Sequence, residues 1–186
     1  HFMWRKKWDN VLSWDFSKPD VKWFEGAQLN ITENCIDRHL VTRGDKTAIL
    51  FEPNNPDEPA EHITYSQLHE RVNKFANVLK AEGIKKGDRV CIYVPMIPEL
   101  AISVLACARI GAIHSVVFAG FSATALSTRI NDCDCKMVVT SDGSYRGAKS
   151  IDLKGIVDEA LKKCPGVKSV LVAKRIHSDI HMKSGR

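Results

Sequence analysis

The feature that most constrains this chain is a regular alternation of two kinds of segment along its second half. Short, almost continuously apolar runs are each followed by a stretch with helical spacing that ends in glycine or polar residues. The apolar runs are RVCIYVP (89–95), IHSVVFAG (113–120), CKMVVTSD (135–142) and KSVLVAKR (168–175), and the helical stretches are PELAISVLACARIG (98–111), SATALSTRIND (122–132) and LKGIVDEALKKC (153–164). Strands that are apolar throughout are typical of a parallel sheet covered on both faces. The sequence therefore predicts an α/β fold, with a mostly parallel sheet and helices on both faces.

The first half gives weaker signals, and we expect two parts. Residues 1–28 hold all four tryptophans without a sustained period, which predicts an irregular Trp-rich segment packed over the body of a domain. Residues 29–186 are predicted to form an incomplete α/β portion. Within it, Asn30 or Thr32 caps a helix over 29–44, a strand follows over 46–52, and a short strand leads into an amphipathic helix over 63–83. An incomplete sheet of this kind is expected to expose an edge.

Composition narrows the class of protein. The 186 residues carry a formal charge of +5, spread without the long basic runs of nucleic-acid arms, and no apolar segment approaches the roughly 20 residues of a membrane span. The six cysteines lack C-x-x-C spacing and predict buried structural thiols. We therefore expect a soluble, cytoplasmic protein with no nucleic-acid or membrane partner. The last residues, HMKSGR, close no element, so the chain is expected to be part of a longer one.

One basic loop stands out in TSDGSYRGAKSIDLK (140–154). Arg146 and Lys149 flank Gly147 and Ala148, so two cations and bare backbone N–H groups can converge on one anion. The loop follows the strand expected at 135–142, and ligands of such sheets collect at the carboxyl ends of strands. Gly120 ends the preceding strand and can approach the same crevice. Taken alone, the loop is better explained as a solvated basic turn than as a phosphate site, because basic residues are mostly exposed.

Known catalytic motifs are missing from the sequence. It has no G-x-G-x-x-G, no G-x-x-x-x-G-K-[ST], no G-x-S-x-G and no H-E-x-x-H. The histidines are scattered among the expected elements, and the close pair Cys133 and Cys135 has no adjacent histidine. We therefore assign no catalytic residue and no metal ligand.

Four segments carry a resemblance to a known family. They are WFEGAQLNITENCIDRHL (23–40), ITYSQLHERVNKFANVL (63–79), GDRVCIYVPMIPELAISVLACARIGAIHSVVFAGFS (87–122) and TSDGSYRGAKSIDLKGIVDEAL (140–161). In order and spacing they resemble the acetyl-coenzyme A synthetases, the AMP-forming acetate–CoA ligases of the adenylate-forming superfamily. The resemblance covers nearly the whole chain, and it implies part of the large N-terminal domain of such an enzyme.

The resemblance implies a reaction and a site. Acetate and ATP, with Mg²⁺, give acetyl-adenylate and pyrophosphate, and the thiol of coenzyme A then releases acetyl-CoA and AMP. In the family, the loop matching Arg146, Gly147, Ala148 and Lys149 faces the 3′-phosphate of coenzyme A, and the glycine matching Gly120 lies against the same ligand. Many relatives have Arg-Ala-Gly-Arg here, so Lys149 supplies a point charge where they offer a bidentate fork.

The family's phosphate loop and catalytic lysine do not occur in this sequence. We therefore expect an inactive N-terminal fragment whose partners are small-molecule substrates and the missing C-terminal part of the same chain. No cofactor is expected on the fragment alone. Two alternatives stay open: a fragment of a propionyl-CoA synthetase, and a stand-alone α/β module that binds coenzyme A or another nucleotide.

Overall fold

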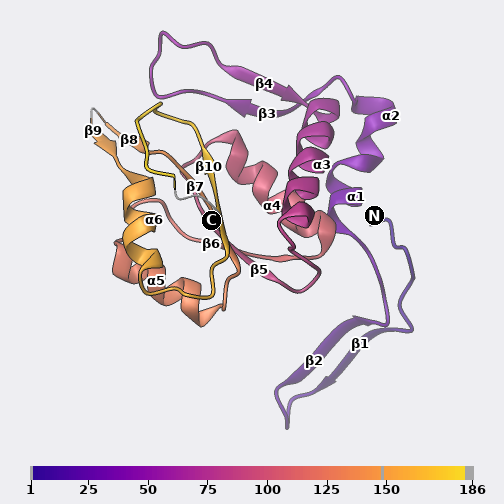
Figure 1. Cartoon of the computed structure of the whole chain (residues 1–186). Helices are drawn as coiled ribbons and strands as arrows, with labels where there is room; N and C mark the ends of the chain where they lie inside the picture. The colour runs from indigo at the N-terminus through magenta and orange to yellow at the C-terminus, as the bar shows by residue number, and fades with distance from the viewer. Residues whose placement is uncertain (1, 148, 183–186) are drawn as a thin grey trace.

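The structure is a computed structural model that describes residues 2–147 and 149–182. Its centre is a four-stranded sheet in the order β10–β7–β5–β6, in which all neighbouring strands are parallel. The strands are β5 (Arg89–Tyr93), β6 (Ile113–Val116), β7 (Met137–Ser141) and β10 (Ser169–Ala173). Figure 1 shows the helices arranged around this sheet. The predicted α/β class and the parallel sheet are confirmed.

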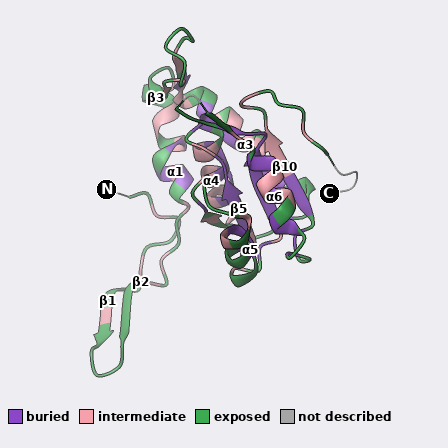
Figure 2. Ribbon diagram, turned by 90° about the vertical axis from the view of Figure 1, so that its left-hand side faces the viewer, coloured by how far each residue is buried: buried purple, intermediate pink, exposed green. Residues whose placement is uncertain are grey.

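Two hydrophobic cores lie on the two faces of the sheet, because successive side chains of a strand point to opposite faces. The helices are α3 (Tyr65–Ala81), α4 (Pro98–Ile110), α5 (Ala123–Asp132) and α6 (Leu153–Leu161). Val90 and Ile92 of β5 belong to the core with α3 and α4. Cys91 and Tyr93 belong to the core with α5 and α6. Figure 2 shows buried residues concentrated in the central strands and on the helix sides that face them.

The helices begin and end at residues that favour these positions. Thr64 and Gln67 form a capping box at the start of α3. The side chains of Ser122 and Asp152 accept backbone N–H groups at the starts of α5 and α6. α4 ends at Gly111, whose φ of +74° places it in the left-handed region that glycine adopts without strain. These local signals explain why the predicted helix boundaries lie close to the observed ones.

The helix predicted over 29–44 is instead three short pieces. They are α1 (Ile31–Cys35), a 3-10 turn η1 (Asp37–His39) and α2 (Leu40–Arg43). The break lies at Ile36, whose φ of −124° and ψ of −68° are not helical. Ile36 is 1% exposed and packs in the core with α3 and α4, so burial of its side chain outweighs one continued helical turn. Of the two predicted caps, Asn30 is the one that accepts the N–H of Thr32.

Strands also occupy two regions outside the main sheet. β3 (Thr47–Phe51) and β4 (Glu61–Thr64) form an antiparallel pair before α3. β1 (Asn10–Asp15) and β2 (Asp20–Glu25) form an antiparallel hairpin that stands apart from the helices and the main sheet (Figure 1). The prediction of an irregular segment here is therefore wrong. The partial alternation of apolar and polar residues on both sides of the turn is the signal it missed.

The tryptophans only partly follow the prediction that they pack on the body. Trp14 and Trp23 lie on the hairpin and are 59% and 60% exposed. Trp4 and Trp8 are half-buried, with ring centroids 5.4 Å apart, and both contact the ring of Phe24. Two of the four indoles are thus more exposed than buried among the described residues. The division of the chain at residues 28 and 29 stays a prediction.

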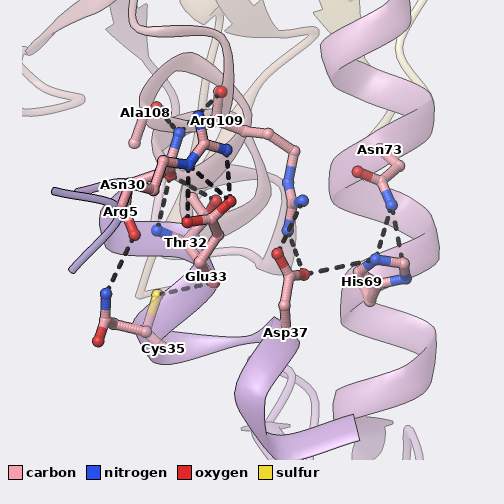
Figure 3. Close-up of polar contacts among 11 residues, drawn as sticks. Arg5, Asn30, Thr32, Glu33, Cys35, Asp37, His69, Asn73, Ala108 and Arg109 are labelled. Atoms are coloured by element: carbon pink, nitrogen blue, oxygen red, sulfur yellow. Dashed lines mark hydrogen bonds and ion pairs between the residues drawn. The ribbon is translucent and has the colours of Figure 1, made fainter. Parts of the chain in front are cut away.

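A polar network ties the N-terminal part to α3 and α4 (Figure 3). Arg109 of α4 donates two hydrogen bonds to the carboxylate of Asp37, at 2.8 and 3.2 Å. Oδ1 of Asp37 also lies 3.4 Å from Nε2 of His69 on α3. The Asn30 amide donates to two carbonyl groups in the last turn of α4, at 3.0 and 3.4 Å. These contacts hold α1 and η1 against the carboxyl end of α4.

The variant Asn30→Ala should lower the free energy of unfolding by about 2 kcal/mol, because it removes both a helix cap and the donor to α4. Urea unfolding at neutral pH measures this change. Asn131→Ala is the matched control, since Asn131 makes one exposed hydrogen bond, to the carbonyl of Lys163. The control should stay within about 0.5 kcal/mol of the parent. Equal losses in the two variants would contradict the role given to Asn30.

Candidate functional site

A cleft of about 660 Å³ opens at the carboxyl ends of β5 and β6. Its apolar wall includes Val94, Ile97, Leu100 and Phe118. Its charged lining residues are Glu52, Arg146 and Arg175. A mostly apolar hollow with a few charged groups, placed at the carboxyl edge of a parallel sheet, is the usual setting of a ligand site in this class of fold.

The predicted basic loop is the turn of a small hairpin at the border of this cleft. Its strands are β8 (Ser144–Arg146) and β9 (Lys149–Ile151), and they pair antiparallel. Arg146 and Lys149 are direct partners in this pairing, and directly opposed residues project from the same face of a hairpin. Both side chains are exposed, and no ion pair holds either of them within residues 2–147 and 149–182. The two cations are therefore placed so that both can contact one anion.

Glycine is required in this turn for its backbone conformation. Gly147 has a φ of +60°, in the region that side-chain-bearing residues rarely adopt, while a Cβ added there would meet nothing within 4 Å. The predicted contact residue Ala148 lies outside the described residues. Of the predicted set, Arg146 lines the cleft, whereas Gly147, Lys149 and Gly120 are not among its lining residues.

Gly120 lies in the loop after β6, next to two residues that do line the cleft, Phe118 and Ala119. Tyr93, buried at the end of β5, donates from its hydroxyl to the carbonyl of Phe121 at 2.8 Å and so fixes this loop to the sheet. A Cβ on Gly120 would lie 3.1 Å from the Phe118 ring. The structure thus brings the Gly120 loop and Arg146 to the same cleft, although Gly120 itself stays at its margin.

Asp142, directly after β7, organises the opposite wall and was not singled out from the sequence. It is 1% exposed, and its carboxylate accepts the N–H groups of Gly143, Arg175, Ile176 and Ser178 at 2.7–3.2 Å. Burial acts to raise the pKa of Asp142, but the hydrogen bonds from these four groups favour its charged form and the net pKa is lowered. Asp142 therefore works as an ionised anchor for the chain that follows β10.

Arg175 is the other residue that sequence reasoning missed. Its backbone N–H is held by Asp142 at 2.7 Å. Its guanidinium carbon lies 5.4 Å from the Phe51 ring centroid and 5.6 Å from that of Tyr145, a stacking arrangement between two aromatic rings. Its Nη2 also donates to the side-chain oxygen of Asn54 at 3.1 Å. Tyr145 precedes Arg146 in β8, so Arg175 supports the strand that carries Arg146, one of the residues predicted to bind a phosphate.

The cysteines are all free thiols, and most are buried in the cores. Burial raises the pKa of Cys107 to about 12. Burial, with the neighbouring Cys133, raises the pKa of Cys135 to about 12. Both thiols are therefore protonated at neutral pH and are poor nucleophiles. In the described part of the chain no group of His, Cys, Asp and Glu could hold a metal ion, and no helix is long and apolar enough to cross a membrane.

Comparisons with known proteins place the chain among acyl-activating enzymes. The family model described as AMP-binding enzyme matches residues 36–183, and the model described as acetyl-coenzyme A synthetase N-terminus matches residues 1–35. An acetyl-coenzyme A synthetase of Halorhodospira halophila is 56% identical over 183 residues, and acetyl-coenzyme A synthetase 2 of Pseudomonas aeruginosa is 55% identical. These matches cover 98% of this chain but only 28% of each relative's length.

A solved structure gives the same result for the fold. The acetoacetyl-CoA synthetase of Streptomyces lividans superposes with a TM-score of 0.88 at 27% identity. The likeness covers 98% of this chain and 27% of that one.

The variant Asp142→Asn should lower the free energy of unfolding by about 3 kcal/mol at pH 7, because an amide cannot accept all four backbone donors and leaves some buried without a partner. The lowered pKa also sets a pH dependence. Since the carboxylate stabilises the fold only when ionised, its contribution is complete above the ordinary aspartate pKa of about 4 and is lost as the pH falls through the lower folded value. Urea unfolding between pH 7 and pH 3 measures both effects.

The exposed Asp132→Asn is the control for this experiment and should behave like the parent. If Asp142→Asn lost as much stability between pH 7 and pH 3 as the parent does, the acid destabilisation would not come from Asp142.

Proposed function

The chain belongs to the AMP-binding enzyme family, with an N-terminus of the acetyl-coenzyme A synthetase type, and from this premise we propose that it is the N-terminal portion of an acetate–CoA ligase. The proposed reaction of the whole enzyme joins acetate to ATP to give acetyl-adenylate and pyrophosphate. Coenzyme A then takes the acetyl group and AMP leaves. The observation that carries the proposal is the match of 98% of this chain to acetyl-coenzyme A synthetases at 55–56% identity.

Within this enzyme, we propose that the β8–β9 turn binds the 3′-phosphate of coenzyme A. Arg146 and Lys149 are opposed across the hairpin, are exposed, and are free of ion pairs with described carboxylates. Arg146 can offer two parallel N–H donors to phosphate oxygens, while Lys149 adds a point charge. Gly147 lets the backbone approach the same anion, and the proposed set also includes Ala148. The donor set fits a phosphate, because it consists of cations and backbone N–H groups.

The remaining part of coenzyme A would extend from this turn into the cleft. The cleft is lined by Arg146 at one side and by Phe118 and Ala119 of the Gly120 loop at another. Its apolar wall suits an uncharged chain better than a second phosphate. Gly120 belongs to the proposed set because its loop borders the cleft, and glycine lets the backbone there lie close to the Phe118 ring. ATP and Mg²⁺ are proposed as substrate and cofactor of the whole enzyme, and none of these residues is assigned to them.

Acetate and a cytoplasmic location complete the proposal. Acetate is supported because the relatives matched at 55–56% identity are acetyl-coenzyme A synthetases, and no observation favours propionate or a stand-alone binding module. All six cysteines are free thiols, as is usual in a reducing compartment. The proposed partners are small-molecule substrates and the remainder of the same polypeptide, since the chain spans 28% of the length of these relatives.

Arg146→Ala in the longer enzyme should weaken binding of coenzyme A by about 10- to 150-fold, the equivalent of a lost charge-assisted hydrogen bond of about 1.5–3 kcal/mol. The dissociation constant of dephospho-coenzyme A, which lacks the 3′-phosphate, should change little. Isothermal titration with both ligands measures the difference. The matched control is Lys168→Ala, which removes one exposed cation at the opposite edge of the sheet, at the amino end of β10. An unchanged affinity for coenzyme A in Arg146→Ala would refute the assignment.

The 186-residue chain alone should show no acetate-dependent exchange of pyrophosphate into ATP, because the family's phosphate loop and catalytic lysine are absent from its sequence. The longer polypeptide, assayed beside it, should show this exchange. Exchange by the short chain would mean that adenylation needs neither element.

A further inference from the structure

The β1–β2 hairpin has one apolar and one polar face. Direct partners in an antiparallel pair share a face, and Leu12 pairs with Trp23 while Trp14 pairs with Val21. These four residues, called here the apolar hairpin face, are 36–60% exposed. The opposite face carries the pairs Ser13 with Lys22 and Asp15 with Asp20, together with Val11, and the polar pair Asn10 with Glu25 ends the apolar face. The part of the hairpin next to its turn is thus amphipathic.

This face is not covered within the described residues. Figure 1 shows the hairpin standing off from the other elements, and Figure 2 shows it exposed almost throughout. A two-stranded hairpin is at best marginally stable in water, and it gains independent stability only when its apolar face packs against something. Two exposed indoles in a single patch mark an interaction surface rather than ordinary solvent exposure.

The apolar hairpin face continues into a second cleft, of about 820 Å³, between the N-terminal segment and the carboxyl end of α4. Trp23 belongs to both surfaces. All charged residues that line this cleft are cations: Arg5, Lys86 and Arg109. Arg5 is paired with Glu33, and Arg109 with Asp37.

Lys86 is the cation of this cleft that is left to bind something else. No ion pair holds it among residues 2–147 and 149–182, and its side chain is exposed. Its stem lies over the backbone of Gly111, where an added Cβ would be 3.0 Å from Cγ of Lys86. The charge of the cleft therefore favours an occupant that carries a carboxylate beside its apolar side chains.

We propose that the apolar hairpin face and the adjoining cleft dock a segment of the same polypeptide that lies beyond the region described here, an apolar segment with an Asp or Glu that pairs with Lys86. This inference rests on the proposed function, because it takes the chain to be part of a longer ligase. The acetoacetyl-CoA synthetase structure supports it. That structure matches 98% of this chain, and the unmatched 2% is too short to contain the β1–β2 hairpin, so the hairpin region is part of the match. The match takes up only 27% of that longer chain. The arrangement therefore occurs beside a large remaining polypeptide.

The size of the surface favours an intramolecular partner over a second copy. Four partly exposed side chains of this kind offer roughly 500 Å² of contact area, on the order of 150–250 Å² for each aromatic residue. A stable dimer usually buries about 800 Å² on each partner, so this face alone falls short of that area. A segment tethered to the same chain has a high effective concentration and needs far less area.

Hydroxyl-radical labelling of the longer polypeptide, read by mass spectrometry, tests the proposal. Trp14 and Trp23 should react at least about fivefold more slowly than tryptophan in an unstructured peptide, at a concentration where sedimentation shows a monomer. Labelling at the peptide rate would overturn the proposal. Protection that disappears on dilution would assign the surface to a second copy, and would also overturn it.

Two pairs of variants identify the contacts. Lys86→Glu should raise the labelling of Trp23 severalfold, whereas Lys85→Glu, which changes the adjacent exposed lysine outside the cleft, should not. Trp14→Ser should likewise expose Trp23, whereas Lys22→Ser on the polar face should not. Equal effects within either pair would refute the docking geometry.

Acetate-dependent exchange of pyrophosphate into ATP is measured on the same samples and separates the two proposals. Exchange with unprotected tryptophans overturns the docking alone. Absent exchange refutes the ligase function, and the labelling of Trp14 and Trp23 still decides whether the surface is covered.

Discussion

The burial of β5 and β7 on both faces is the constraint on which the rest of this structure depends. Every residue of β7 is buried, and β5 supplies alternate side chains to the two cores. Strands buried in this way need helices on both sides, and the returning helices make the strands parallel. Parallel strands bring their carboxyl ends to one edge of the sheet. The cleft, the Gly120 loop and the β8–β9 hairpin all lie at that edge as a consequence.

Asp142 links the buried sheet to the exposed basic turn through a series of contacts. Its carboxylate holds the backbone of Arg175, and the Arg175 guanidinium packs on the ring of Tyr145, the neighbour of Arg146. Each step in this series is fixed by a contact between a more buried residue and a less buried one. An exposed arginine supported in this way loses less conformational entropy when it binds an anion than one on a mobile loop. The proposed phosphate binding by the basic turn therefore depends in part on Asp142, which is not one of the proposed contact residues.

The sequence predicted the elements whose signals are local and missed those that depend on long-range contacts. The strands of the main sheet and helices α3 to α6 follow from apolar runs, capping residues and glycine stops close to each element. The prediction of one helix over 29–44 was wrong, because Ile36 is buried against core residues that lie far along the sequence. The basic turn could be located, since Arg146 and Lys149 flank it directly. Asp142 and Arg175 could not be linked, because 33 positions separate the carboxylate from its donor.

Helix α4 runs between the two clefts described above. Its amino end, at Ile97, borders the cleft with Arg146, and its carboxyl end, at Arg109, borders the cleft beside the hairpin. Strand β6, at the edge of the described sheet, leaves Ile113 and Val116 more than half exposed, whereas edge strands of finished domains usually carry charges or are covered. Apolar surface at a sheet edge and on a projecting hairpin is stabilised when further polypeptide covers it. Both surfaces therefore support the view that this α/β unit reaches its stable form as part of a larger enzyme.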